Sequence, residues 1–523
     1  MKKVFLLIIS FNLFFCAALN IRPSLKRTSV SGEPLISVKL PFNTKSLTVS
    51  DRSGFWVKDS NTSAFFDEKE LNVFLSVQSL PVYEYILIFG KYRSYENAVE
   101  YRNRISKKNG DLKIEKTGEF DFSASGGIRS LTFYTITSES FRDLKSMTDF
   151  RIKNNLTGEL RRKISTSGRG RIIITSGSRT VEFSNPVFIY PRNRNDVFSV
   201  KDKSSENGSQ NYSGFIRLDI SETGDFSIIN QLDLENYVQG VVANEMNPEW
   251  HTESLKAQAV LSRTLAYKKI LRTTHKAGFD ISDSELTQVF SGNAEINSNV
   301  IDAVSATTGL VILHNDALAD ILFSACCGGV MSAASDYWSG SNPVINENTS
   351  DNYSKSPEDL SDETGFRKWM NKRGGHFCSS EKIEKKADIS WEKSLYRWET
   401  LISALEIQNN ITQYFSNNTG RIIDVLISER YRSGNIKKVR IVGTFDNIDI
   451  TDPIIIRRVF RAKSAKFYVE KTGNNIQFKL IGAGSGHGAG ICQLGALGMA
   501  LDGFNYDEII KHYLKNVSII RAY

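Results

Sequence analysis

The chain has 523 residues, of which 40% are hydrophobic and 24% charged, and its formal net charge is +8. This length predicts about two to four domains, and the composition is that of an ordinary globular protein. A basic surface favours polyanions. The sequence contains no basic run with interleaved aromatic residues, which argues against nucleic acid and leaves an anionic cell wall or membrane surface as the partner.

The N-terminus indicates export. Lys2 and Lys3 precede a short apolar stretch at residues 4–15, which small residues follow. This pattern is typical of a secretory signal, whereas a membrane-spanning helix needs about 20 apolar residues. We therefore expect a signal peptide at residues 1–18 and a protein exported to the periplasm or cell envelope.

A lipoprotein signal is the alternative interpretation of the same segment. In that case Cys16 is acylated and anchors the protein, although the bulky Phe15 before it fits this signal poorly. The mature chain is expected to begin near Leu19, or at the acylated Cys16. No later segment is long and apolar enough to span a bilayer, so we expect no transmembrane helix in the mature chain.

The N-terminal region, residues 19–200, is predicted to be a small α+β unit. Residues 82–89 alternate in part like a strand, and Ala98, Tyr101 and Ile105 recur at helical spacing. Strand, glycine turn and helix at residues 82–120 resemble a peptidoglycan-binding SPOR repeat. The alternative is an α/β unit of no special function.

A composition change predicts the second domain boundary. Arg171–Thr175 and Val181–Phe183 predict a hairpin, and the polar residues that follow predict a linker at 201–211. Residues 212–523 are predicted to form the main domain, of mixed α/β structure. The whole chain is therefore expected to be of the α+β class.

A helix ending at Glu245 opens this domain. Strands at residues 215–220 and 226–229 lead to Asp233, which is placed to cap the helix by accepting backbone N–H bonds. Leu234, Val238 and Val241 recur at helical spacing and define one face, and Glu245 lies on that face. A carboxyl group directed toward apolar neighbours is desolvated, which favours its protonated form and suits a general acid. The alternative is a solvated glutamate at a fraying helix end.

Five ordered blocks carry a resemblance to a known family. They are residues 236–246, continued at 253–260 (ESLKAQAV); 287–292 (TQVFSG); 303–309; 323–329 (FSACCGG); and 486–496 (GHGAGICQLGA). Residues 212–523 thereby resemble the stage II sporulation protein D family, also called the amidase enhancer family. The resemblance implies nothing about the first two hundred residues.

The resemblance implies a lytic transglycosylase that cleaves peptidoglycan glycan strands, preferring those stripped of peptide, with Glu245 as its single catalytic residue. The same resemblance suggests a second reading, a non-catalytic wall-binding enhancer of a separate amidase. It also implies glycan contacts from several further residues, with His487 as an alternative structural residue of a tight turn. These candidates are Gln288, Ser324, Gly328, Gly329, Gly486, His487, Gly488 and Gln493.

No cofactor and no metal are expected. Some family members hold zinc near the TQVFSG block, but residues 282–287 contain no cysteine or histidine here. Cys326, Cys327, His376 and Cys378 could form a different zinc site. Export favours oxidation instead, so we expect a disulfide from Cys378 to Cys326 or Cys327. The last cysteine, Cys492, is expected to be a buried small hydrophobe in a helix.

Overall fold

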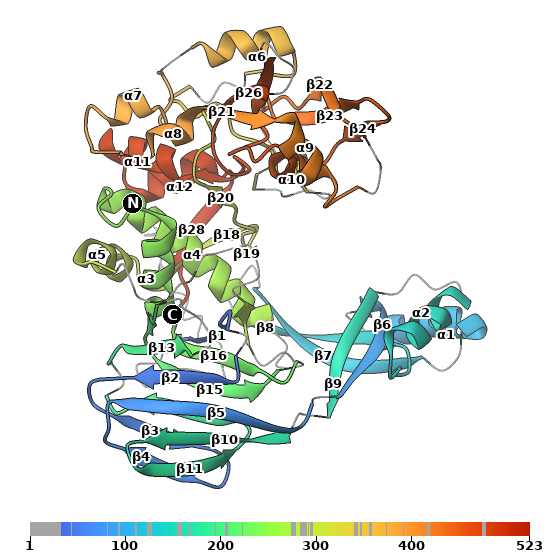
Figure 1. Ribbon diagram of the computed structural model, residues 1–523, viewed down its shortest axis with the longest axis vertical. Coiled ribbons are helices and arrows are strands. Elements are labelled where there is room, and N and C mark those ends of the chain that lie inside the picture. The colour runs from blue at the N-terminus through green and yellow to red at the C-terminus, as the bar shows by residue number, and fades with distance from the viewer. Residues whose placement is uncertain are drawn as a thin grey trace, which may run out of the picture.

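The computed structural model describes residues 33–523 apart from short gaps, so the predicted signal at residues 1–18 lies outside the described part. The gaps are residues 43, 81, 93–94, 110–111, 123–127, 154–158, 167–168, 194, 204–207, 222, 273–278, 283–289, 291, 293–295, 339–341, 343, 346–347, 355–357, 373, 391, 416–418 and 473–476. Two large sheets, a helix layer and two parts that mix helices with strands can be distinguished (Figure 1), and the predicted α+β class is confirmed. Within the described ranges, no helix has both the length and the apolar character needed to cross a membrane.

Two large sheets form one end of the molecule. The first has seven strands in the order β17 (Ile281–Ser282), β1 (Leu35–Lys39), β16 (Phe226–Asp233), β15 (Phe215–Ile220), β12 (Val187–Pro191), β3 (Phe55–Lys58) and β4 (Ser63–Phe66). The second has six strands in the order β11 (Arg179–Ser184), β10 (Arg169–Ser176), β5 (Glu70–Ser79), β2 (Ser46–Ser50), β13 (Phe198–Asp202) and β14 (Gln210–Tyr212). The predicted hairpin is β10 and β11, and the strands predicted before Asp233 are β15 and β16.

These two sheets share one hydrophobic core. Buried positions alternate along β2 and β3, as expected for strands with one face turned inward. Val49 of the second sheet and Val57 of the first belong to the same buried cluster. β1 pairs with β16, and β13 pairs with β14. Strands from both sides of residues 201–211 therefore contribute to the same core.

A smaller sheet is inserted between β5 and β10, which are themselves paired, with Ser79 opposite Arg169. The insertion lies beside the stacked sheets (Figure 1) and has the chain order β-α-β-β-α-β. Its elements are β6 (Val82–Tyr92), α1 (Tyr95–Asn109), β7 (Lys113–Phe122), β8 (Ile128–Thr137), α2 (Leu144–Lys153) and β9 (Glu159–Thr166), with sheet order β7-β8-β6-β9. The strand and helix predicted at its start are confirmed.

A helical layer follows β16 and carries the site. Its helices are α3 (Leu234–Glu245), α4 (Thr252–Arg272) and α5 (Ser298–Ala306). The long helix α4 contacts α3, α5 and two C-terminal helices, α11 (Gln493–Leu501) and α12 (Tyr506–Tyr513). Next to α4 lies the sheet of β18 (Leu310–His314), β19 (Ala317–Leu318) and the last strand, β28 (Val517–Arg521). The end of the chain thus returns to the helix layer.

The remaining elements lie at the opposite end from the large sheets (Figure 1). β20 (Phe323–Ser324) pairs with β27 (Ile491–Cys492), which leads directly into α11. The others are η1 (Ala334–Asp336), α6 (Glu363–Met370), α7 (Ser380–Ile383), α8 (Lys393–Tyr396), β21 (Arg397–Ser403), α9 (Ala404–Ile411), β22 (Ile422–Arg430), β23 (Ile436–Gly443), β24 (Asn447–Ile450), α10 (Pro453–Val459), β25 (Phe467–Lys471) and β26 (Gln477–Ala483). Among them β21 to β26 with α9 and α10 surround a second hydrophobic core, and α6 contributes to a third.

Candidate active site

Glu245 is the last residue of α3. Leu234, Val238 and Val241, which define the predicted apolar face, are all fully buried, and Glu245 itself is partly buried. Beyond it the helix ends, because the chain turns to an extended conformation at Met246. The sequence pattern therefore placed this carboxylate correctly at a helix end that the core holds in place.

The start of α3 differs from the prediction. Asp233 occupies the N-cap position, but its side chain makes no capping hydrogen bond. Asp233 is also the last residue of β16, where it pairs with Leu35. The backbone N–H of Leu234 donates instead to the carbonyl oxygen of Pro34, at 2.9 Å. The strand pairing thus satisfies the first helix N–H, while the expected side-chain cap is absent, so this part of the prediction is wrong.

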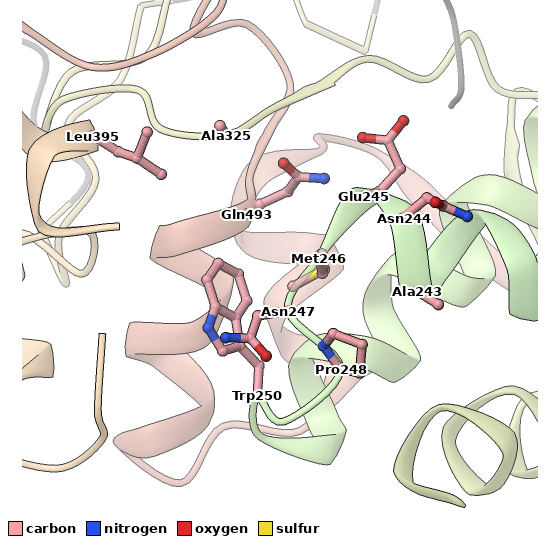
Figure 2. Close-up of a pocket in the computed structure, with 10 residues that line it drawn as sticks. All are labelled: Ala243, Asn244, Glu245, Met246, Asn247, Pro248, Trp250, Ala325, Leu395 and Gln493. Atoms are coloured by element: carbon pink, nitrogen blue, oxygen red, sulfur yellow. The ribbon is translucent and has the colours of Figure 1, made fainter. Parts of the chain in front are cut away.

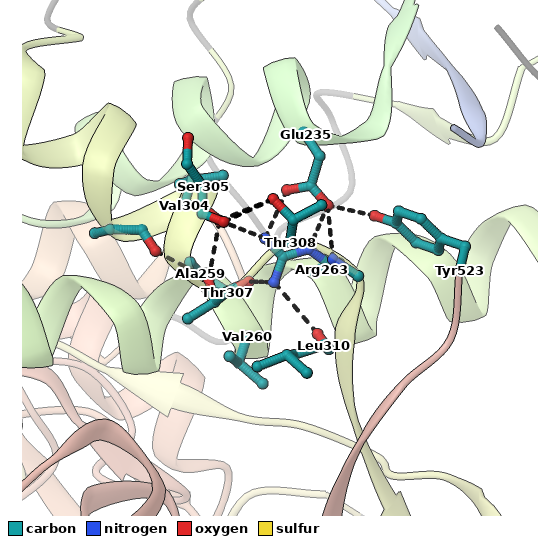
Figure 3. A network of polar contacts seen from close by, with 12 residues as sticks. Glu235, Ala259, Val260, Arg263, Val304, Ser305, Thr307, Thr308, Leu310 and Tyr523 are labelled. Atoms are coloured by element: carbon teal, nitrogen blue, oxygen red, sulfur yellow. Dashed lines mark hydrogen bonds and ion pairs between the residues drawn. The ribbon is translucent and has the colours of Figure 1, made fainter. Parts of the chain in front are cut away.

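A buried ion pair fixes α3 against α4 (Figure 3). The Arg263 guanidinium donates two hydrogen bonds to the Glu235 carboxylate, from Nε to Oε1 at 2.8 Å and from Nη2 to Oε2 at 2.6 Å. The Arg263 side chain is completely buried, and that of Glu235 is 10% exposed. Glu235 Oε1 also accepts hydrogen bonds from the Gly309 backbone N–H and the Tyr523 hydroxyl. This network joins α3, α4, the loop before β18 and the C-terminus, so it sets the orientation of the helix that carries Glu245.

A pocket of about 340 Å³ opens at Glu245 (Figure 2). One wall comes from the end of α3 and the turn that follows it. The other wall comes from three later segments of the chain, with Ala325 after β20, Leu395 of α8 and Gln493 at the start of α11. The lining residues are Ala243, Asn244, Glu245, Met246, Asn247, Pro248, Trp250, Ala325, Leu395 and Gln493. The pocket therefore combines one carboxylate, three amides and an apolar floor.

Among the described residues that line this pocket, Glu245 is the only acidic one. Glu392 lies behind the wall: it is completely buried, and its Oε1 accepts from Asn247 Nδ2 at 3.2 Å. Glu249 is exposed and accepts from Asn297. Glu253 pairs with Lys256 and accepts the backbone N–H of Tyr506, which helps to hold α12. None of these three carboxylates lines the space that Glu245 faces.

Of the predicted glycan-contacting residues, Gln493 shares the pocket with Glu245. Its Nε2 donates to Gln258 Oε1 of α4 at 3.3 Å, which holds the amide against the helix layer. Ser324 is buried in β20, next to the pocket residue Ala325. Gln288 lies outside the described residues.

The predicted glycines do not line this pocket, and packing explains them. Gly328, Gly329, Gly486 and Gly488 all have positive φ. At Gly329 an added Cβ would lie 2.6 Å from Nδ1 of His376. Close packing and a left-handed backbone therefore require glycine at this position, independently of any ligand.

His487 likewise lies outside the pocket and is held by its surroundings. Its Nδ1 accepts from the Ala489 backbone N–H at 3.0 Å, and its ring meets Tyr337 and Trp338 edge-on. Burial lowers the pKa of His487 to about 4. The imidazole is therefore neutral at pH 7, with its proton on Nε2. This geometry supports the structural alternative for His487.

Sequence reasoning missed Asn247, Trp250 and Leu395 in the pocket and Glu392 behind it. Asn247 and Trp250 lie within five residues of Glu245, so proximity along the chain was an available signal. Leu395 offered none, because α8 is a single short helix that reaches the site only through the tertiary fold.

The cysteines also differ from their expected setting. Cys492 is the N-cap of α11, and its sulfur accepts the backbone N–H groups of Cys327 and Gly495. It is buried as expected, but it is not simply a small hydrophobe inside a helix. The four cysteines of the described chain are unbonded, and Cys327 Sγ lies 3.7 Å from Cys378 Sγ. The disulfide stays a prediction.

Two family models match the chain. A model described as "Stage II sporulation protein" matches residues 222–314, which include α3, α4 and Glu245. A model for a domain of unknown function matches residues 332–490. The two matches together cover most of the chain that follows β15.

Three relatives extend this result. An uncharacterized protein of Brachyspira hyodysenteriae is 30% identical over 334 residues, which are 62% of this chain and 76% of that protein. The amidase enhancer of Bacillus subtilis is 24% identical over 448 residues, 79% of this chain but only 58% of that protein. Stage II sporulation protein D of B. subtilis is 24% identical over 323 residues, 59% of this chain and 80% of that protein. The chain belongs to the stage II sporulation protein D and amidase enhancer family.

Proposed function

We propose that this protein is a lytic transglycosylase that cleaves peptidoglycan glycan strands, preferentially those stripped of peptide, in the cell envelope. Its family has a cell-wall-related role. One observation carries the proposal further: Glu245 is the single acidic group among the described residues around a pocket of about 340 Å³. Hydrolases that cleave glycosidic bonds use two carboxylates flanking the bond. A lytic reaction needs one.

In the proposed reaction Glu245 acts twice. It first protonates the glycosidic oxygen, so the bond to the muramic acid breaks and the leaving sugar departs with a hydroxyl group. The Glu245 carboxylate then takes the proton from the C6 hydroxyl of the same muramic acid, whose oxygen closes on C1. The product is a 1,6-anhydro-muramyl end, and the carboxyl group has regained its proton. Asn244, Asn247 and Gln493 provide amides suited to sugar hydroxyls, and the buried Trp250 contributes an apolar part of the lining.

The products test this mechanism. Digestion of peptide-stripped glycan should release fragments that end in anhydro-muramic acid, which mass spectrometry distinguishes from hydrolysed ends by the loss of one water. Intact peptidoglycan should be a poorer substrate. Reducing muramic acid ends would contradict the lytic mechanism, because they require an activated water and hence a second carboxylate.

The second candidate, a non-catalytic enhancer of a cell-wall amidase, is favoured by the match to an amidase enhancer along 79% of this chain. The same digestion separates the two functions. An enhancer leaves purified glycan uncut and accelerates peptide release only when an amidase is added. A transglycosylase cuts the glycan without a partner.

We further propose that the inserted module, residues 82–166, binds the wall. Its β-α-β-β-α-β order begins with the strand and helix that resemble a SPOR repeat, so the proposal depends on fold analogy.

A deletion tests this assignment. Because β5 and β10 are paired neighbours, residues 81–168 can be replaced by a short glycine-containing turn that keeps this pairing. This deletion should weaken binding to insoluble peptidoglycan about 10²-fold, through loss of a second linked contact. Cleavage of short soluble glycan, as the internal control, should be unchanged, and unaltered binding to the wall would contradict the assignment.

A further inference from the structure

Four cysteine sulfurs meet at one buried point of the fold. Cys326 and Cys327 follow β20, Cys378 precedes α7, and Cys492 is the N-cap of α11. Each of the four is at most 1% exposed. Three separate stretches of chain, 51 and 165 residues from Cys327, therefore bring thiols to the same place.

Three of these sulfurs, together with the Asp351 carboxylate, have the spacing of ligands around one ion. Cys327 Sγ lies 3.7 Å from Cys378 Sγ, and the ligand atoms of Cys327, Cys378, Cys492 and Asp351 all lie within 4.8 Å of one another. The Cys326 thiol also interacts with the thiols of Cys378 and Cys492. Four thiolates bound tetrahedrally to zinc at about 2.3 Å lie about 3.8 Å apart. A disulfide requires about 2.05 Å.

Backbone donors are already aimed at the sulfurs. Gly328 N–H donates to Cys326 Sγ and Gly329 N–H to Cys327 Sγ, each at 3.4 Å, and Cys327 N–H donates to Cys492 Sγ at 3.2 Å. Hydrogen bonds to a sulfur favour its charged form, the thiolate that binds metals. The glycine conformations described above allow the loop to turn both adjacent thiols toward the same point, which adjacent residues of a regular strand cannot do.

Two buried charged groups, Lys466 and Asp351, lie beside the cysteine cluster. Lys466 is 2% exposed, and its ammonium group donates to the carbonyl oxygens of Cys327 and Val330 at 3.0 and 2.6 Å. A buried cation beside this loop offsets the negative charge of a zinc ion with four thiolates. The buried Asp351 accepts from the backbone N–H of Cys378 at 2.9 Å and from the Tyr513 hydroxyl at 2.7 Å. It thereby fixes the backbone of the ligand Cys378, and carboxylates commonly hold metal ligands in place in this way.

We propose that Cys326, Cys327, Cys378 and Cys492 bind one structural Zn²⁺ ion. Binding displaces the thiol protons to solvent and involves no oxidation. This site excludes the disulfide expected from the sequence, since both use the same thiols. Its consequence for the pocket is direct: Ala325 and Gln493, which line the wall opposite Glu245, are the immediate neighbours of Cys326 and Cys492. The ion would tie these two wall segments together.

The first test measures the metal in the full-length mature protein. Purification without added metal or chelator should give about one zinc per chain by elemental analysis, as expected for a closed four-ligand site. A mercurial thiol reagent should release the zinc, and a separate sample denatured with a chelator and without the mercurial should show four free thiols. Absence of zinc, together with disulfide-linked peptides in a non-reducing map, would overturn the proposal in favour of the disulfide.

Matched variants separate ligand loss from general destabilisation. Cys378→Ser should lower zinc affinity by more than the ~10–100-fold typical of losing an outer-shell partner. Val330→Ala removes buried apolar volume from the same loop without removing a ligand, so it should lower stability while zinc stays stoichiometric. If Cys378→Ser does not fold, cobalt substitution of the wild-type protein decides the question. Thiolate-to-cobalt charge-transfer bands are expected, and their absence would also reject the site.

Discussion

Replacing Glu245 by glutamine should lower the rate of glycan cleavage about 10²–10⁴-fold, the usual contribution of a general acid and base. Glutamine keeps the shape of the side chain and its hydrogen-bonding capacity but has no transferable proton. Glu245 is partly buried at the end of a helix that the core and the Glu235–Arg263 pair hold in place, so the fold should not change. Glycan binding should persist, because seating a neutral sugar does not require the charge. Single-turnover cleavage and equilibrium binding measure the two effects separately.

Glu249→Gln is the matched control for this experiment. Glu249 is four residues from Glu245, is exposed, and contacts Asn297 instead of the pocket. The same chemical change at this position should leave cleavage unaltered. Wild-type cleavage by Glu245→Gln would refute the assignment. The enhancer function would then be examined next, together with Glu249 and Glu253.

Replacing Arg263 by methionine should destabilise the protein by about 3–5 kcal/mol, because Glu235 would keep a buried charge without its partner. The Arg263 side chain is completely buried and forms two hydrogen bonds to Glu235, at 2.8 and 2.6 Å. Cleavage should fall as well, since this pair sets the orientation of α3 and hence of Glu245. Chemical unfolding measures the first effect and cleavage at low temperature the second.

Arg440→Met provides the matched control. Arg440 also makes two hydrogen bonds to a carboxylate, Asp449, at 2.7 and 2.8 Å, but its side chain is 48% exposed. Loss of this surface pair should cost about 0–1 kcal/mol. The double variant Glu235→Met/Arg263→Met should recover much of the lost stability, because it leaves no unpaired buried charge. Equal destabilisation by Arg263→Met and Arg440→Met would show that burial of the pair does not matter.

Local patterns in the sequence predicted the elements around the site. The spacing of Leu234, Val238 and Val241 predicted the helix that ends at Glu245. The hairpin of β10 and β11 followed from its turn residues. In each case neighbouring residues carry the signal, since helical and strand periods repeat within a few positions.

Long-range contacts decided what these patterns could not. The Asp233 side chain makes no capping bond, and a residue distant in the sequence, Pro34, accepts the first helix N–H. The pairing of β1 with β16 joined segments that the sequence had assigned to different domains. No local period records which strand will pair with which, so such contacts are invisible until the chain is folded.

The sequence alone determined the chain's α+β class and the helix-end position of its candidate catalytic glutamate, because both depend on local periodicity and motifs. Only the tertiary structure decided what faces that glutamate. Gln493 and Leu395 reach the pocket from elements about 150–250 residues away. The same long-range packing gathers Cys327, Cys378 and Cys492 at one buried point, next to the equally buried Cys326. Burial of a shared core brings these residues together, and that driving force depends on the whole chain rather than on any one segment.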